Sequence, residues 1–189
     1  LATCSIGNSQ IVAWDTSGQV GNEASFTATT INANLETVAL TRGAGLSVSS
    51  LVNSFSSSSF DSANLAAAET ANEYLTFSIA PKSGYQVSLT TLDASFRRSS
   101  TGPNTFQWVY SLDSFATSGV NIGSEFSYTD SGGTTGDDQS QINLSSISAL
   151  QSITATATFR LYGYGGSSGA GTFAIGRNGT DLAIGGSLA

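Results

Sequence analysis

Several residue types on which catalytic and metal sites depend are absent or rare in this chain of 189 residues. It contains no His and no Met, a single Cys (Cys4), a single Lys (Lys82) and only two Pro. Without His, the chain lacks the imidazole of a Ser–His or Cys–His catalytic pair and the ligand sets typical of zinc sites. A single Cys excludes a disulfide within the chain, so the fold has to be stabilised by packing.

Charged side chains are also scarce, since they make up 10% of the chain. Disordered proteins combine high charge with few aromatic residues, whereas this chain has 10 Phe, 6 Tyr and 2 Trp. The net charge of −7, with Arg97–Arg98 as the one basic doublet, is unsuited to binding nucleic acid. No apolar run approaches the ~20 residues of a transmembrane helix. We therefore expect a folded protein with no nucleic-acid partner and no transmembrane segment.

Small hydroxyl side chains, by contrast, are abundant, and many of them alternate with apolar ones. The chain has 33 Ser and 22 Thr, and alternation of this kind is the pattern of half-buried strands. A strand is expected at 74–80, in which Leu75, Phe77 and Ile79 face inward. Further strands are expected at 10–14, 24–31, 37–42, 85–89, 92–98, 105–112, 152–162, 172–175 and 181–184. One short helix is expected at 62–71.

This pattern predicts an all-β fold, namely a single two-sheet antiparallel β-sandwich of jelly-roll type with at most one or two short helices. Many short strands in one chain of this length favour a sandwich. Their alternation favours antiparallel pairing, because strands of parallel sheets are usually buried on both faces. There is no linker and no internal repeat, so residues 10–189 are expected to form one domain.

Residues 1–9 precede the first expected strand and contain no charged side chain. Such a segment, which includes Cys4 and Ile6, is suited to adding a strand to an open sheet edge of a second molecule. Head-to-tail contacts of this kind do not close on themselves, so they would build a filament. The alternative is a frayed terminus. A start at Leu1 without an initiator Met is expected of an exported chain after signal-peptide removal, or of a fragment.

Three stretches resemble secreted bacterial β-sandwich domains of the kind found in PEP-CTERM-type exported and surface proteins. They are Arg97–Pro103 with Ser111–Phe115, Phe159–Tyr164 with Gly171–Phe173, and Leu40–Leu46. The resemblance extends over roughly residues 10–188, but Ile175–Asn178 replaces the Asp-Asn pair typical of such domains. It implies a domain of a bacterial cell surface or extracellular matrix, and it implies no defined reaction.

A structural salt bridge is predicted between Arg98 and Asp113. Arg98 stands an even number of residues after Ala94 and Phe96, so it is expected to share their inward face of the strand. Asp113 follows the next expected strand. An Arg that faces inward at the rim of a sandwich requires a carboxylate partner. A ligand-binding role for the pair is the alternative. Arg97 lies on the opposite face of the strand and is expected to be solvated.

The alternation of side chains between the two faces of a strand separates aromatic residues of the core from a candidate binding surface. Trp108 and Tyr110 share a face with Phe106 and Leu112, and four bulky apolar residues at period two indicate core rather than a sugar-stacking platform. The candidate polar binding surface is the outward face of the strand expected at 152–162. Its members are Thr154, Thr156, Thr158, Arg160 and Tyr162.

Carboxylates suggest two further sites. A Gly-rich loop carries three candidate calcium ligands, namely Asp130, Asp137 and Asp138. The alternative is a solvated loop without a metal ion. No other cofactor is expected. A glycosidase-like acid pair would have to come from Glu73, Asp93, Asp113 and Glu125, but nothing in their spacing selects two of them.

The leading expectation is a non-catalytic, structural and self-associating domain that is exported to a bacterial cell surface or extracellular matrix. Hydroxyl-rich strands with almost no Lys favour self-association, because Lys residues usually protect sheet edges from pairing with other chains. A module that binds extracellular polysaccharide is the first alternative. A carboxylate-dependent enzyme acting on glycosides is the second.

Overall fold

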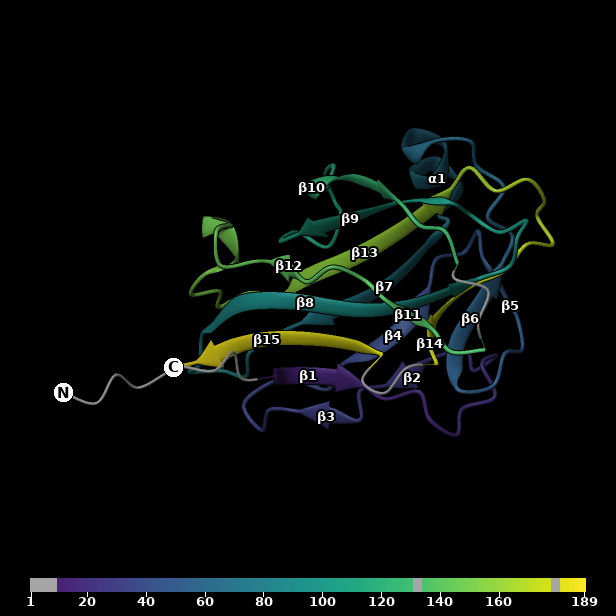
Figure 1. The fold of residues 1–189 in the computed structure, drawn as a ribbon. Coiled ribbons are helices and arrows are strands. Elements are labelled where there is room, and N and C mark those ends of the chain that lie inside the picture. Colours follow the sequence, from purple (N-terminus) through teal and green to yellow (C-terminus); the bar gives the residue numbers. More distant parts are fainter. Residues whose placement is uncertain (1–9, 131–133, 178–180) are drawn as a thin grey trace.

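The protein is a two-layer β-sandwich in which both layers are antiparallel sheets (Figure 1). The computed structural model describes residues 10–130, 134–177 and 181–189. The predicted all-β class and two-sheet sandwich are confirmed, and the described residues contain one α-helix and one 3₁₀ turn (Ser148–Leu150). No helix of these residues is long and apolar enough to cross a membrane.

The first sheet is built around its longest strand, β8. Its order is β3 (Thr30–Ile31), β1 (Gln10–Trp14), β15 (Leu182–Leu188), β8 (Val87–Arg98), β14 (Phe173–Gly176), β6 (Ser54–Ser58) and β5 (Ser47–Val48). Two short strands also pair with β8, namely β11 (Asp137–Asp138) and β12 (Ile142–Asn143). β15 and β14 follow one another along β8, so the sheet divides into two branches there.

The second sheet lies against the first. Its order is β10 (Val120–Ser127), β9 (Thr105–Ser111), β13 (Ala157–Tyr164), β7 (Tyr74–Ile79), β4 (Ala39–Arg42) and β2 (Phe26–Thr27). The chain crosses between the sheets from β7 to β8 to β9, and again from β12 to β13 to β14. Repeated crossing of this kind is the connectivity of jelly-roll sandwiches.

A buried carboxylate joins the strands where the first sheet divides. Asp181, 1% exposed, accepts hydrogen bonds from the backbone N–H (2.8 Å) and from the hydroxyl (2.5 Å) of Thr16. The N–H of Asp181 in turn donates to the carbonyl of Trp14 (3.1 Å). These bonds fix the end of β1 against the start of β15.

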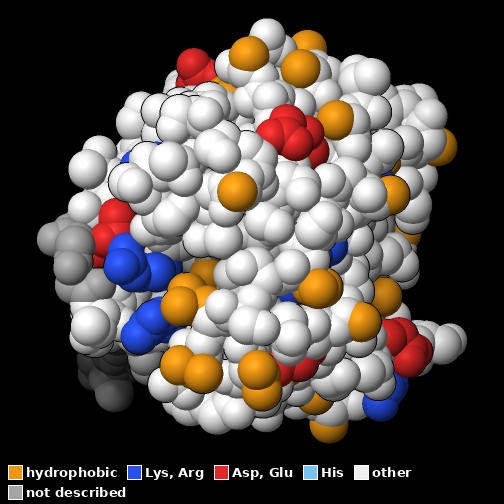
Figure 2. Space-filling view, turned by 90° about the vertical axis from the view of Figure 1, so that its right-hand side faces the viewer, with side chains coloured by type: hydrophobic (Ala, Val, Ile, Leu, Met, Phe, Trp, Pro, Cys, Tyr) orange, Lys and Arg blue, Asp and Glu red, His pale blue; other side chains and the backbone are white. Residues whose placement is uncertain are grey.

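The outer surface carries few charges and few large hydrophobic side chains. Figure 2 shows one face on which hydrophobic side chains are scattered and charged ones form small groups among uncharged polar atoms. Val48 and Val120, each 53% exposed, are among the large apolar side chains that do reach solvent. This surface agrees with the abundance of Ser and Thr in the sequence.

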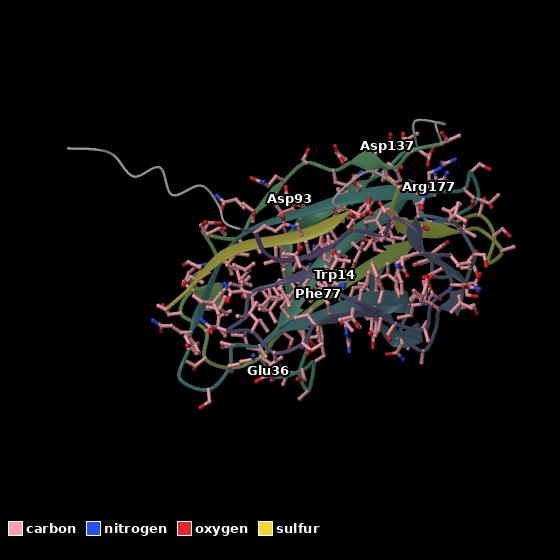
Figure 3. The ribbon with its side chains drawn as sticks, turned by 90° about the horizontal axis from the view of Figure 1, so that it is seen from below. Trp14, Glu36, Phe77, Asp93, Asp137 and Arg177 are labelled. Carbon is pink, nitrogen blue, oxygen red and sulfur yellow. The ribbon has the colours of Figure 1, made fainter. Side chains whose placement is uncertain are left out.

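The core between the sheets is strongly aromatic. Trp14 of β1 packs on Phe77 of β7 with 5.0 Å between ring centroids (Figure 3). Phe77 also stacks on Phe159 of β13 with 5.1 Å between ring centroids. Towards the other end of β8, Phe96 contacts Phe106 of β9 at 5.4 Å. Burying each such ring contributes on the order of 2–3 kcal/mol, so contacts that join the two sheets dominate the stability.

The expected short helix is present as α1 (Leu65–Ala71), and it lies on the outer face of the second sheet. The side chain of Asn64 accepts a hydrogen bond from the N–H of Ala67 (3.0 Å) and so caps the first turn. Asn72, with a φ of 59°, ends the helix in the left-handed conformation. Ala68 is fully buried against the end of β13, which the helix therefore covers.

Several expected boundaries were wrong. The strand expected at 152–162 begins only at Ala157, and the segment before it is irregular. The strands expected at 85–89 and 92–98 form the single strand β8, with a β-bulge at Thr90 in place of the bend. Leu112 lies beyond the end of β9 and is 42% exposed, so its expected place in the core was also wrong.

Candidate functional site

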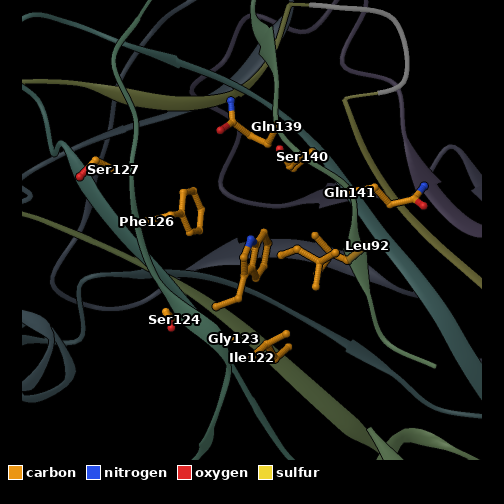
Figure 4. A pocket seen from close by; sticks show the side chains of 12 residues that line it. Leu92, Ile122, Gly123, Ser124, Phe126, Ser127, Gln139, Ser140 and Gln141 are labelled. Carbon is orange, nitrogen blue, oxygen red and sulfur yellow. The ribbon is translucent and has the colours of Figure 1, made fainter. Parts of the chain in front are cut away.

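A pocket of about 360 Å³ opens between β10 of the second sheet and the segment 139–142 of the first (Figure 4). Both sheets contribute apolar side chains to it, namely Leu92, Ala94, Trp108, Ile122, Phe126 and Ile142. Its polar lining consists of Ser124, Ser127, Gln139, Ser140 and Gln141, together with the backbone of Gly123. None of the described residues that line this pocket is charged.

The pocket lies beside an irregularity in β10. Ile122 pairs with Trp108 and Phe126 with Phe106, so three residues of β10 stand opposite one residue of β9. Gly123, the first of the three, has a φ of 66°, which side chains disfavour. The bulge is held by a buried amide, because Gln107 Nε2 lies 3.3 Å from the carbonyl oxygen of Ile122 and 2.7 Å from that of Trp108. The site is therefore built into the sheet rather than carried by a loose loop.

Trp108 lines this pocket although it is only 2% exposed. Its ring contacts Phe77 in the core, with 6.3 Å between the centroids. Within the described part of the chain, the indole N–H of Trp108 makes no hydrogen bond, whereas that of Trp14 donates to the carbonyl of Phe26 at 2.9 Å. The indole nitrogen of Trp108 is also not among the polar atoms that are sealed from solvent without a partner. It is therefore a donor with some exposure, on a side chain that lines the pocket.

The core position predicted for Trp108 and Tyr110 is confirmed, since they are 2% and 6% exposed. The alternation of apolar and polar residues in the sequence does not indicate the pocket beside Trp108. Gly123 within an apolar and hydroxyl stretch is the one local indication of a bulge, because glycine inside a strand often marks one.

The polar surface expected on β13 is not open to a ligand. Tyr162 and Arg160 point outward as expected, but other side chains cover them. Tyr162 is 1% exposed and belongs to the cluster under helix α1. The Cζ of Arg160 lies 4.0 Å from the ring centroid of Tyr74 and 3.7 Å from that of Phe115. Parity predicts the face on which a side chain lies, but not what packs on that face.

The threonines of that expected surface also do not form one row. Thr158 lies in β13, and its hydroxyl shares a hydrogen bond with the hydroxyl of Ser78 in β7 (2.9 Å). Thr154 and Thr156 precede the strand in irregular backbone. A binding surface made of these residues with Arg160 and Tyr162 is therefore not supported by the structure.

The predicted salt bridge between Arg98 and Asp113 is not formed. Arg98 instead donates from Nη2 to the carbonyl of Gly102 (2.7 Å). Asp113 accepts hydrogen bonds from the hydroxyls of Ser111 and Thr117 (2.6 Å each), and these bonds hold the pKa of its carboxyl below the ordinary value. Each residue forms hydrogen bonds within the turn that follows its own strand. Pairing opposite charges in the sequence does not predict such local bonds.

The ion pair of this region joins Arg97 to Asp130. Their side chains are 25% and 12% exposed, so the expectation that Arg97 is solvated was wrong. Asp130 also accepts a hydrogen bond from the backbone N–H of Arg98 (3.1 Å). The two arginines therefore have different partners: Arg97 binds the carboxylate of Asp130, and Arg98 binds the turn that follows β8.

The acidic loop is anchored to the first sheet by protein donors. The hydroxyl of Tyr128 donates to Asp137 (2.7 Å), and burial together with this bond raises the pKa of the phenol. Asp138 accepts a hydrogen bond from the hydroxyl of Ser95 (2.6 Å). In the part of the chain that the structure describes, no three His, Cys, Asp or Glu residues form a group able to hold a metal ion. The calcium site expected at Asp130, Asp137 and Asp138 is therefore not supported.

The remaining acids considered for catalysis are engaged in separate contacts. Glu73 is 5% exposed and accepts a hydrogen bond from a backbone N–H (3.0 Å). Glu125 accepts from the hydroxyl of Tyr164 (2.6 Å), whose pKa is raised by burial and by this bond. Asp93 accepts from Nε2 of Gln141 (2.8 Å). These contacts fix backbone and side chains, as structural acids do.

Arg42 is a structural residue that the sequence patterns did not single out. It extends from β4 of the second sheet to β6 of the first, where it donates to the hydroxyl of Ser57 (2.8 Å) and the carbonyl of Ser56 (2.6 Å). It also donates to the carbonyl of Glu23 (2.5 Å), and its Cζ lies 3.7 Å from the ring centroid of Phe55. Burial lowers its pKa to about 10.

Comparison with known proteins finds no matching family model, no matching curated protein and no matching solved structure. Cys4 and Ile6, the residues of the expected strand donor, lie outside the described residues. Function is therefore inferred from the geometry of the sandwich.

Proposed function

We propose that this protein is a non-catalytic structural domain of a bacterial cell surface or extracellular matrix, and that copies of it associate edge to edge through β10. The observation that carries the proposal is the outer edge of β10, hereafter the free edge, with which no strand of the described residues pairs. This strand of eight residues ends the second sheet and pairs along one side with β9. An unpaired row of backbone N–H and C=O groups is a template for a further strand.

The other sheet ends offer much less. The terminal strands β3, β5 and β2 have two residues each, so they present few unpaired backbone groups. β10 contains no Lys and no Pro, which commonly block strand addition. Its one charged residue, Glu125, accepts a hydrogen bond from Tyr164 within the same molecule. The bulge at Gly123 limits regular pairing to part of the strand, and this favours a weak and reversible contact.

A place outside the cell is supported by the composition of the chain together with the resemblance of its motifs. A hydroxyl-rich surface loses little side-chain entropy on contact, which suits repeated weak association. The motifs Arg97–Pro103 and Phe159–Tyr164 resemble exported bacterial surface domains, and this resemblance supports a place outside the cell. The scattered contacts of Glu73, Asp93 and Glu125 support a non-catalytic role.

The test places a charge on the free edge. Val120→Lys in β10 and Val48→Lys in β5 form a matched pair, because both valines are 53% exposed on terminal strands. We expect sedimentation velocity to show concentration-dependent association of the unsubstituted chain and of Val48→Lys, and a monomer for Val120→Lys. Association that survives Val120→Lys would contradict the proposal.

Deletion of residues 1–9 then distinguishes two geometries of association. Pairing of β10 with β10 of a second copy is two-fold symmetric and closes as a dimer, whereas donation of the N-terminal segment builds an open filament. If the deletion leaves the assemblies unchanged, the pairing is between two β10 strands. If the deletion removes them, the segment is the added strand.

A further inference from the structure

Trp108, which lines the pocket, carries a hydrogen-bond donor that none of the described residues uses. Tryptophan N–H groups usually find a partner when the ring is buried, as that of Trp14 does with the carbonyl of Phe26. The Trp108 side chain is 2% exposed and lines the pocket, and its N–H is neither sealed from solvent nor bonded to an acceptor among the described residues. A ligand that supplies an acceptor at this point gains a hydrogen bond at no cost to the fold.

The lining of the pocket restricts the chemical class of that ligand. No charged residue is among the described residues that line it, so an ionic ligand would lose its hydration without gaining a counter-charge. The volume of about 360 Å³ lies near the lower end of the roughly 300–1,000 Å³ of ligand pockets, which suits a single small ring. Apolar side chains and serine hydroxyls share the lining, so the ligand has to carry both kinds of group.

We infer that this pocket binds a neutral saccharide unit that carries an acetamido group. An acetamido group joins an apolar methyl to a carbonyl oxygen that accepts a hydrogen bond. The pocket offers the complementary pair, namely the indole N–H of Trp108 and the apolar side chains of Leu92 and Phe126. The serines at 124 and 127 line the same pocket from β10 and are suited to the ring hydroxyls. Little of the Trp108 ring is exposed, so the contact is a hydrogen bond rather than ring stacking.

This inference goes beyond the proposed association, because it concerns a small ligand rather than a second copy. The pocket and the free edge both involve β10, so the two proposals have to be tested separately. Val120 does not line the pocket. Saccharide binding is therefore measured on the Val120→Lys chain, in which edge pairing is blocked, as well as on the unsubstituted chain.

The probes are diacetylchitobiose and cellobiose, two neutral disaccharides that differ in the acetamido groups. We expect isothermal titration calorimetry to show saturable binding of diacetylchitobiose and at least about tenfold weaker binding of cellobiose, since the latter leaves the donor unpaired. Trp108→Phe keeps an aromatic ring but removes the N–H, and it should weaken the binding of diacetylchitobiose by about tenfold. Trp14→Phe is the control, because it removes a buried N–H that does not line the pocket.

A second variant keeps the test decisive if Trp108→Phe does not fold. Ala94→Leu adds a larger apolar side chain to the pocket lining, and it should abolish binding while thermal unfolding remains cooperative. Equal affinity for the two disaccharides, binding of neither, or unchanged affinity in Trp108→Phe and Ala94→Leu would each overturn the inference. Binding of a strand-forming peptide in the pocket, without any effect of the saccharides, would overturn it as well and would assign the pocket to strand pairing.

Discussion

Arg42 joins the two sheets through one partly buried guanidinium. With a pKa of about 10 it stays protonated at neutral pH, although burial opposes its charge. We expect Arg42→Met to lower the free energy of unfolding by about 2–3 kcal/mol, because it removes the donor to the carbonyl of Glu23 and the hydrogen bonds to Ser56 and Ser57. Lys82→Met is the control, since Lys82 is exposed and donates to one carbonyl. Urea unfolding measures both, and equal losses would contradict this role of Arg42.

Buried phenols make the stability sensitive to high pH. Burial, reinforced by hydrogen bonds to Asp137 and Glu125, raises the pKa values of Tyr128 and Tyr164 above the unfolded value of about 10. The folded state then holds protons that the unfolded state releases, so this stabilisation is complete below about pH 10 and is lost as the pH rises further. We expect Tyr128→Phe to lose less stability than the unsubstituted chain between about pH 9 and pH 11.

The measurement is the thermal unfolding midpoint across that range of pH. Tyr85→Phe serves as the control, because Tyr85 is 40% exposed and makes no comparable buried bond to a carboxylate among the described residues. A fall in the midpoint that is as steep in Tyr128→Phe as in the unsubstituted chain would show that the Tyr128 phenol does not contribute.

At the scale of the element, the bulge of β10 depends on the backbone of Gly123. Its φ of 66° lies in the left-handed region, and a Cβ placed there would meet no atom within 4 Å. Substitution is therefore opposed by backbone strain alone, and Gly123→Ala should cost about 1–2 kcal/mol. Gly84→Ala is a matched control, because Gly84 has a φ of 88° and equally open surroundings.

Chemical denaturation of the two variants should give similar losses. Gly123→Asn should cost less than Gly123→Ala, because Asn tolerates the left-handed conformation. If Gly123→Ala were neutral while Gly84→Ala were destabilising, β10 would have another conformation available at the bulge.

The elements that were predictable are those defined by local rules. Period-two alternation predicts β7 almost residue by residue. It also predicts the outward face for Arg160 and Tyr162, although α1 and Phe115 cover these side chains. The helix was predictable from its Ala run. The bulge of β10, the partner of Arg97 and the cover on β13 depend on contacts between distant segments, and parity carries no information about these contacts.

At the scale of the whole molecule, the two sheets share one core, so they should unfold together. The core cluster is continuous from Trp14 in the first sheet through Phe77 and Phe159 in the second. Arg42 adds a polar link between the same layers. The inner face of each sheet is buried only by the other sheet, and this favours a single cooperative transition.

The two tryptophans allow a direct test, because each sheet contains one. Trp108→Phe leaves Trp14 as the fluorescent reporter of the first sheet, and Trp14→Phe leaves Trp108 as the reporter of the second. Within each variant, we expect the fluorescence midpoint to coincide with the midpoint from far-ultraviolet circular dichroism. Trp14→Phe should be the less stable variant by about 0.5–1.5 kcal/mol, because it removes the buried hydrogen bond from the indole N–H to the carbonyl of Phe26, whereas the N–H of Trp108 has no partner among the described residues to lose. Fluorescence midpoints that depart from those of circular dichroism, in either variant, would mean that one sheet melts while the other persists.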